Sequence, residues 1–298
     1  MRGLREIVAD PTYGGVQPRR AMSLQSYLHI MQKPLFPLLL LFCSLPAFGQ
    51  IHTFAVAPDA TMLRPAAQIL IAGSGSVQGA NGTFFHSDIV VLNYRTVSQR
   101  VAFTWLPNGQ TAGAPMFLTI NASSGIISED FVGTILGQSG LGALLITGVD
   151  STGALDPSAQ LYATERVWTP QPGSGGTVSQ SFPPIATSDI NLTRATILGQ
   201  RLDARYRTNV GIVNLDTVAR TFDVVQTTDD PTAPQNTSTV TVQPMSMVQI
   251  PLPNLTSSAL QIAVQPEVAI NPALWMAYGS SVDNSTGDSW SSLGFQAR

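Results

Sequence analysis

The stretch FHSDIVVLNYRTV (residues 85–97) returns as YRTNVGIVNLDTV (residues 206–218), and this recurrence decides the expected fold. The offset is 121 residues with no gap, and three pairs are identical: Asn93 and Asn214, Thr96 and Thr217, Val97 and Val218. Weaker matches link residues 119–126 to 241–248 and residues 142–146 to 258–262, at offsets of 122 and 116. Self-similarity of this length predicts two copies of one structural unit, with insertions in the loops between matched strands.

Each unit has the pattern of short strands separated by turns. Apolar and polar residues alternate most clearly at residues 101–105 and at the matching residues 222–226. In the first unit we expect strands near residues 67–72, 86–93, 100–106, 116–121, 124–128, 142–148, 160–168 and 177–182. Many short strands without long helices predict an all-β protein of two tandem β-sandwiches, residues 66–184 and 185–298. A single closed barrel is the alternative, but units of this size fit sandwiches better.

One insertion in the first unit has a helical pattern. We expect Ser128 to cap a short helix over residues 129–136, with Glu129 and Asp130 in its first turn and a glycine at its exit. One face of this helix is apolar and is expected to close one end of the first sandwich. It is formed by Phe131, Ile135 and Leu136. Residues 182–184 end in two prolines, which predicts a short and stiff linker between the units.

Residues 31–49 have the pattern of an export signal. Lys33 precedes an apolar run over residues 35–45, and small residues at Ala47 and Gly49 form a cleavage signature. The run is shorter than the roughly 20 residues of a membrane span, although a retained anchor is the alternative. Residues 1–30 look like an unstructured leader or a misassigned start, and residues 50–65 like an N-terminal extension. We therefore expect a secreted protein, extracellular or periplasmic, with no membrane span after cleavage.

The composition after residue 49 restricts the classes of partner and chemistry. This part of the chain has no cysteine and no lysine, ten arginines and sixteen acidic residues, a net charge of −6. An acidic chain without lysine argues against nucleic acid as a partner, because phosphate backbones need clustered cations. A disulfide framework, a cysteine nucleophile and a lysine Schiff base are all excluded by composition. We expect no cofactor, and stability that comes from packed cores.

The strand pattern resembles a known family. Residues 89–93 form an apolar strand that ends in Asn, and residues 101–105 form an alternating strand closed by Pro-x-Gly at residues 107–109. This pattern resembles that of the bacterial extracytoplasmic immunoglobulin-like modules, in both units. The second unit lacks the Pro-x-Gly closure, and neither unit has the core disulfide of antibody domains. The resemblance implies a surface, adhesive or scaffolding role and brings no catalytic residues.

Candidate catalytic groups are few. A Ser-His-Asp arrangement needs a histidine beside a serine, and only His52 and His86 follow residue 49. His86 matches Arg207 in the second unit, which favours a solvated residue or one paired with an acid. Glycoside hydrolysis needs two carboxylates across a cleft. The adjacent pairs at residues 129–130 and 229–230 suit a helix start and a turn instead.

Metal ligands are equally sparse. Two histidines without a cysteine do not make a zinc site. Residues 283–288, with the sequence DNSTGD, offer oxygen ligands like a calcium loop, but they lack the alternating acids and the distant Glu of an EF-hand. The same residues favour a hairpin turn. We therefore predict no metal site.

Aromatic residues give the positive indication of ligand binding. Trp168 and Trp290 flank the last hairpin of each unit and are the candidate ligand-binding residues, through stacking on sugar rings. Trp105 also lies on a predicted strand, and Trp275 is expected in the core. Exposure of Trp168 and Trp290 on one face would favour this role, and burial of all four tryptophans would oppose it.

The expected function is non-catalytic binding or scaffolding in the extracytoplasmic space. The candidate contact loops are residues 93–100, 214–220 and 227–238, and the expected partner is a cell-surface protein or a polysaccharide. A carbohydrate-binding module is the leading alternative and a glycan-acting hydrolase comes third. The sequence does not indicate the oligomeric state.

If the two units fold separately, residues 185–298 expressed alone should unfold in one cooperative transition. Thermal unfolding followed by circular dichroism measures this. A fragment without a folded baseline would instead indicate one interlocked domain.

Overall fold

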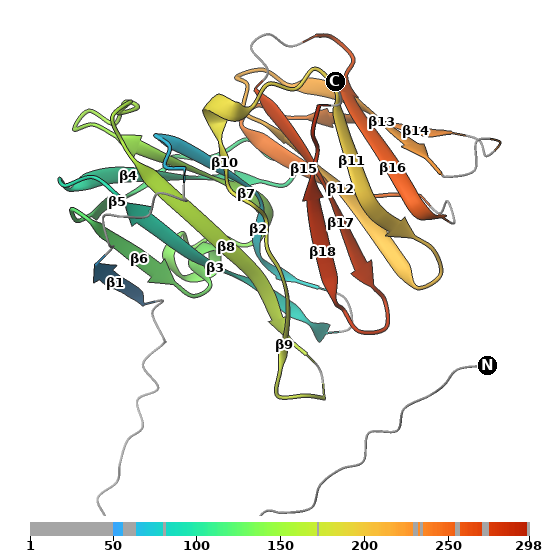
Figure 1. The fold of residues 1–298 in the computed structure, drawn as a ribbon, viewed down its shortest axis with the longest axis horizontal. Coiled ribbons are helices and arrows are strands. Elements are labelled where there is room, and N and C mark those ends of the chain that lie inside the picture. Colours follow the sequence, from blue (N-terminus) through green and yellow to red (C-terminus); the bar gives the residue numbers. More distant parts are fainter. Residues whose placement is uncertain are drawn as a thin grey trace, which may run out of the picture. The chain divides into compact units, whose positions relative to one another are not determined.

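The computed structural model describes residues 50–55, 64–79, 82–171, 173–228, 232, 235–253, 257–269 and 274–296, which lie in one compact unit of residues 46–298. The expected export signal, the leader and residues 229–230 lie outside the described residues. The protein is nearly all β, as the strand pattern predicts, and all eight strands expected in the first unit are present (Figure 1).

The strands follow one another along the chain with short connections. They are β1 (Ile51–Ala55), β2 (Gln68–Gln78), β3 (Phe84–Asn93), β4 (Gln99–Pro107), β5 (Met116–Ile120), β6 (Ser124–Ser128), β7 (Gly140–Val149), β8 (Leu161–Pro170), β9 (Thr177–Gln180), β10 (Ile185–Ala186), β11 (Ala195–Leu202), β12 (Tyr206–Asn214), β13 (Arg220–Thr227), β14 (Asn236–Val242), β15 (Ser246–Pro251), β16 (Ser257–Pro266), β17 (Trp275–Asp283) and β18 (Ser289–Leu293). The short β1 and β10 are additions to the strands expected from the sequence.

The pairing of strands is antiparallel and follows the same order twice. Strands β2-β7-β4-β5 and β6-β3-β8-β9 are neighbours in the first set, with β10 beside β2 and β1 beside β6. These two runs join into one ten-stranded sheet through a short pairing of Val77 with Phe85. In the second set, β11-β16-β13-β14 and β15-β12-β17-β18 form two four-stranded sheets. Apart from the β2–β3 pairing, β11 to β18 thus have the same neighbours within their set as β2 to β9.

Some of these strand pairings are the same as in immunoglobulin domains, and others differ. The second strand of each set pairs with the fifth and the third with the sixth, as in immunoglobulin domains. In those domains the first strand pairs with the second and the last with the sixth. Here the first strand, β2 or β11, lies beside the sixth, and the seventh, β8 or β17, lies beside the second.

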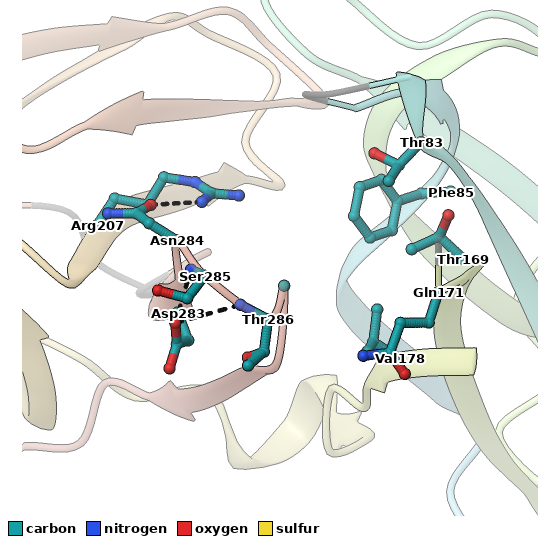
Figure 2. A pocket seen from close by; sticks show the side chains of 11 residues that line it. Thr83, Phe85, Thr169, Gln171, Val178, Arg207, Asp283, Asn284, Ser285 and Thr286 are labelled. Carbon is teal, nitrogen blue, oxygen red and sulfur yellow. Dashed lines mark hydrogen bonds between the residues drawn. The ribbon is translucent and has the colours of Figure 1, made fainter. Parts of the chain in front are cut away.

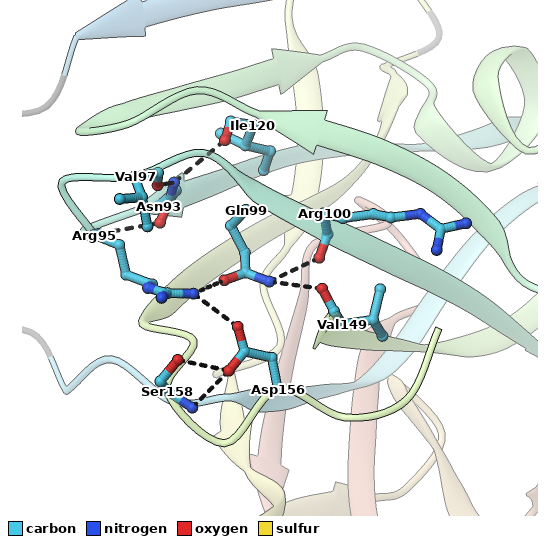
Figure 3. Close-up of polar contacts among 9 residues, drawn as sticks. All are labelled: Asn93, Arg95, Val97, Gln99, Arg100, Ile120, Val149, Asp156 and Ser158. Carbon is cyan, nitrogen blue, oxygen red and sulfur yellow. Dashed lines mark hydrogen bonds and ion pairs between the residues drawn. The ribbon is translucent and has the colours of Figure 1, made fainter. Parts of the chain in front are cut away.

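A buried asparagine joins the two runs of strands at an equivalent corner of each set, and Figure 3 shows the corner of Asn93 in the first set. Asn93, fully buried at the end of β3, donates from Nδ2 to the carbonyls of Val97, Ile120 and Asn121 at 2.9, 3.2 and 3.0 Å. Its Oδ1 accepts from the Arg95 N–H at 3.0 Å. The side chain therefore ties the β3–β4 turn to the end of β5, in the way that an Asn at a strand end bonds to nearby backbone.

Asn214 makes the equivalent bonds at the end of β12. Its Nδ2 donates to Val218, Val242 and Gln243 at 2.9, 3.2 and 3.0 Å, and its Oδ1 accepts from the Asp216 N–H at 3.0 Å. The chain turns back beside each asparagine through a non-glycine residue with positive φ, Ser123 at 44° and Met245 at 45°.

An ion pair extends the corner in the first set (Figure 3). Arg95 donates from Nη1 to Gln99 Oε1 at 2.6 Å and to Asp156 Oδ2 at 2.7 Å. The Ser158 hydroxyl, followed by its backbone N–H and by Arg95, lowers the pKa of Asp156. The second set uses a different pair, in which Arg220 binds Asp216 from the same turn.

The helical insertion is shorter than the sequence pattern predicts. It is a single π-helical turn, η2 (Phe131–Ile135), preceded by Asp130 in the left-handed region with a φ of 44°. The predicted cap on Ser128 is wrong, because Asp130 takes the cap position and no side chain caps the turn. Phe131 nevertheless packs into the core against Phe103, with 4.9 Å between ring centroids, as the apolar face predicts.

The connection between the two sets is packed rather than exposed. Phe182 is buried, and its ring meets Tyr278 of β17 edge-on at 4.9 Å. Gly73 of β2 makes room for this ring, because an added Cβ would lie 2.5–2.8 Å from it. Buried residues of both sets belong to one hydrophobic cluster. Separate folding of residues 185–298 stays a prediction. A fragment of these residues lacks Phe182 and therefore lacks the contact of its ring with Tyr278.

Replacing Asn93 or Asn214 with alanine should lower the free energy of unfolding by about 2–4 kcal/mol, because one buried carbonyl, of Ile120 or Val242, and two part-buried carbonyls lose their donor. Asn121→Ala is the matched control, since this asparagine is exposed at the same corner. Urea unfolding measures both. Equal stability of Asn93→Ala and Asn121→Ala would contradict the structural role of Asn93.

Candidate functional site

The candidate site is a cleft of about 300 Å³ between the ends of the two strand sets (Figure 2). One wall comes from β3, β8 and β9 with Thr83, Phe85, Thr169, Gln171 and Val178, and the other from β12 and the β17–β18 turn with Arg207 and residues 283–287. Most of these side chains carry a hydroxyl, amide or guanidinium, while Phe85 and Val178 provide apolar surface. The cleft therefore offers hydrogen bonds on both walls and a partly apolar wall on one side.

The β17–β18 turn is held rigidly by Asp283. Oδ1 of Asp283 accepts from the backbone N–H groups of Ser285 and Thr286 at 2.8 and 3.3 Å, and Oδ2 accepts from Arg205 at 2.8 Å. The turn closes with Gly287 at a φ of 78°, whose N–H donates to the Asp283 carbonyl. Residues 283–288 thus form the hairpin turn that the sequence favours over a calcium loop.

Groups around Asp283 stabilise the ionised form of its carboxyl. The Ser285 N–H, followed by the Arg205 guanidinium, holds the pKa of Asp283 below its usual range. Both carboxylate oxygens already accept hydrogen bonds, so this carboxylate has its charge balanced by the chain itself. Among the described residues, no group of three or more His, Cys, Asp or Glu side chains is placed to hold a metal ion.

Arg207 supplies the positive charge of the cleft. It is exposed on β12, and its Nη1 donates to Asn284 Oδ1 at 2.6 Å, which fixes the guanidinium above the turn. Figure 2 shows Arg207 and Asn284 across the cleft from Phe85 and Thr169. A guanidinium held at one end recognises carboxylates and other planar oxygen acceptors.

The two candidate tryptophans are partly exposed and lie in separate clusters. Trp168 stacks against His86 at 5.1 Å, and Phe84 lies on His86 at 4.9 Å, which makes an aromatic row across β3 and β8. Trp290 meets Tyr206 edge-on at 5.6 Å and donates its indole N–H to the Gly199 carbonyl at 2.8 Å. Neither tryptophan lines the cleft.

The other tryptophans and the candidate catalytic groups have structural surroundings. Trp105 and Trp275 are both buried. Trp275 is fully buried and packs against Phe222. His86 Nδ1 lies 3.2 Å from Asp130 Oδ2, so of the two surroundings expected for this histidine it has the one beside an acid. Residues 229–230 lie outside the described residues, and so does part of the candidate loop 227–238. The candidate loops 93–100 and 214–220 do not line the cleft.

A buried carboxyl lies in the core of the first set. Glu165 of β8 is 3% exposed and accepts a hydrogen bond from the Ser74 hydroxyl. Burial raises the pKa of Glu165 from 4.5 to about 8, although the Ser74 hydroxyl opposes this shift. Burial, followed by the charge of Glu165, also raises the pKa of the Tyr278 hydroxyl, which donates to Gln249 at 2.8 Å. Burial therefore favours the protonated form of Glu165.

Sequence reasoning missed the cleft and Glu165 for different reasons. Arg207 matches His86 in the repeat, but the wall it faces comes from residues between Thr83 and Val178, well before it in the chain. Glu165 had a local signal, since alternation from Leu161 and Ala163 places it on the inward face of β8. An acid on an inward face of a strand is the pattern to look for.

Comparison with known proteins does not assign a family. No protein-family model matches the chain, and no curated protein matches it. A crystal structure of Thermotoga maritima 1070 has 12% sequence identity and a TM-score of 0.30, covering 36% of this chain and 96% of that one. Momordica charantia 7S globulin has 10% identity and a TM-score of 0.17, covering 83% and 79%. Similarity this low carries no argument about fold or function.

The helices of the described residues are single turns. None of them has the length and apolar character that crossing a membrane requires.

The stability of the protein should fall as the pH rises from about 5 to about 8.5. The pKa of Glu165 is higher in the folded than in the unfolded state, so folding favours the protonated carboxyl, and this stabilisation is lost as the pH rises through about 8. The loss should be on the order of a few kcal/mol and should be much smaller in Glu165→Gln, which keeps the shape without the titration. Urea unfolding across this pH range measures both proteins.

Carboxyls with a lowered pKa, such as Asp216 beside Arg220, change the free energy of unfolding with pH only below this pH range. Parallel pH profiles of the two proteins between pH 5 and 8.5 would contradict the assignment to Glu165.

Proposed function

We propose that this chain is a secreted, non-catalytic protein that binds an extracytoplasmic ligand in the cleft between its two strand sets. The observation that carries the proposal is the cleft itself, where Arg207 and the β17–β18 turn face Phe85 and Thr169. Secretion rests on the export-signal pattern of residues 31–49. The partner is a cell-surface protein or a polysaccharide that presents hydrogen-bond acceptors to Arg207.

The chemistry of the cleft supports binding. Its acidic side chain, Asp283, accepts hydrogen bonds on both oxygens and has a lowered pKa, which suits a structural carboxylate better than a general acid or base. Hydroxyl and amide groups of Thr169, Gln171 and Thr286 bind polar ligands without reacting with them. A few polar groups beside limited apolar surface fix the orientation of a ligand.

The proposed architecture is a tandem pair of β-sandwich units, residues 66–184 and 185–298, of the kind that the immunoglobulin-like resemblance implies. The equal order of neighbours in β2–β9 and β11–β18 supports this duplication, and so do the equivalent bonds of Asn93 and Asn214. On this proposal the cleft arises from the way two copies of one unit are joined.

A carbohydrate-binding module is the second candidate. The aromatic row of Phe84, His86 and Trp168 favours it, because Phe84 is 39% exposed and Trp168 is partly exposed on the same two strands. The Arg166 guanidinium lies 5.7 Å from the Trp168 ring centroid and adds a hydrogen-bond donor beside it. Sugar rings stack on such surfaces. In this role the ligand would lie on β3 and β8 and not in the cleft.

Incubation of the protein with washed cells and with insoluble polysaccharides tests both candidates. If the cleft binds, Arg207→Ala should weaken retention by about 10- to 100-fold, since a charge-assisted hydrogen bond is lost. Arg194→Ala is the matched control, an exposed arginine outside both the cleft and the aromatic row. Loss of retention in Trp168→Ala, but in neither arginine variant nor Trp290→Ala, would favour the aromatic row. Unchanged retention of Arg207→Ala would contradict the proposed site.

A further inference from the structure

In each strand set, the strand at one equivalent sheet edge, β6 or β15, forms backbone hydrogen bonds with a segment that does not belong to that set. In the second set this edge is β15, whose other side pairs with β12. The β4–β5 connection of the first set lies along it: Gly109 N–H donates to the Met247 carbonyl and Ala112 N–H to the Met245 carbonyl, both at 2.8 Å. Asn108 adds a side-chain bond to the Gln249 N–H at 3.0 Å.

In the first set the equivalent edge is β6, and β1 covers it. The two strands are antiparallel and pair over five positions, from Ile51 opposite Ser128 to Ala55 opposite Ser124. The Ser124 hydroxyl also donates to the Phe54 carbonyl at 2.8 Å. The cover is therefore a backbone ladder with one added side-chain bond.

The side chains of β1 bury little surface. Four of its five residues are exposed, including Phe54 at 39%, and Ile51 alone among them packs against the core. By contrast, residues 107–112 are continuous with β4 and β5 on either side and cannot leave β15 without disrupting both. Backbone hydrogen bonds contribute only about 1 kcal/mol each in net terms, so β1 is held weakly.

Neither strand of this pair carries the features that protect a sheet edge. The sequences IHTFA and SGIIS contain no lysine, acid or proline. Departure of β1 would expose the unpaired backbone of β6 beside Ile126 and Ile127. A strand with the sequence of β1 from a second copy restores the same ladder in the same register, because every paired residue is identical.

We propose that the edge of β6 is a strand-docking site and that its occupant in a dimer is β1 of a second copy, exchanged reciprocally. The exchange creates no new side-chain contact and needs no ligand, so it is independent of the cleft. It makes the protein a dimer at high concentration, with the two cleft walls of each copy unchanged.

Two single-cysteine variants test the exchange. His52 and Ile127 lie opposite each other in the β1–β6 pair and both are exposed. Opposed residues in antiparallel strands have Cα separations within the range of a disulfide. In the full chain carrying Cys43→Ser, which removes the only native thiol, His52→Cys and Ile127→Cys are prepared separately, mixed and oxidised mildly.

The expected result is a disulfide-linked dimer of the two different variants. It should form at least about tenfold faster than with the control mixture of His52→Cys and Thr237→Cys, because docking raises the effective thiol concentration to the millimolar range. Thr237 is exposed on β14, away from β6. The size difference of a tagged partner identifies the mixed dimer on a non-reducing gel.

The double variant His52→Cys with Ile127→Cys separates the alternatives. If it closes an internal disulfide while the mixture reacts no faster than the control, β1 pairs only within its own chain and the proposal is wrong. If it closes no disulfide and the mixture is also slow, β1 does not dock on β6 at all, which equally overturns it. Thermal unfolding of each variant checks that the chains are folded.

Discussion

The fold depends on a buried amide that bridges two sheets at each of two equivalent corners. At these corners the chain crosses from one sheet to the other twice, once between β3 and β4 and once between β5 and β6. The two crossings leave the buried Ile120 carbonyl and the part-buried Val97 and Asn121 carbonyls without a backbone donor, and the Asn93 amide binds all three. Asn214 does the same for β12 to β15. An amide fits this position because it donates two protons and accepts one bond from the turn.

Contacts between the two strand sets create the cleft and cover the edge of β15, which neither set does by itself. Phe182 packs against Tyr278, and Gly73 allows its ring to approach β2 closely. Residues 107–112 cover the edge of β15, and the ends of β8 and β9 face the β17–β18 turn. The cleft is a consequence of this packing, because its two walls come from different sets. The first set has no equivalent neighbour on β6, which is why a separate strand, β1, takes that place.

The charged groups are used mainly for local structure. Asp283, Asp156 and Asp216 each accept hydrogen bonds from a turn or an arginine, and each has a lowered pKa. Glu165 is the exception, since burial raises its pKa and it lies beside Ser74 in the core. Arg207 differs in another way, because its guanidinium is exposed at the cleft and its described partner is the neutral side chain of Asn284. This contrast is what makes Arg207 the residue to test for binding.

The sequence by itself determined the class of fold, the strands β2 to β9 and the match between Asn93 and Asn214. Alternation, turn residues and the recurrence at a fixed offset are local properties, so residues 86–93 and 124–128 could be assigned to strands without a structure. The comparison of units indicated a solvated or acid-paired His86, but it did not indicate that the acid is Asp130. The sequence could not show that the first and seventh strands exchange neighbours relative to an immunoglobulin domain, nor that Asp130 takes the cap position before η2. Only the tertiary structure decided these, together with the cleft and the cover of β6 by β1, because each depends on segments that are distant in the chain and meet only when the sheets pack.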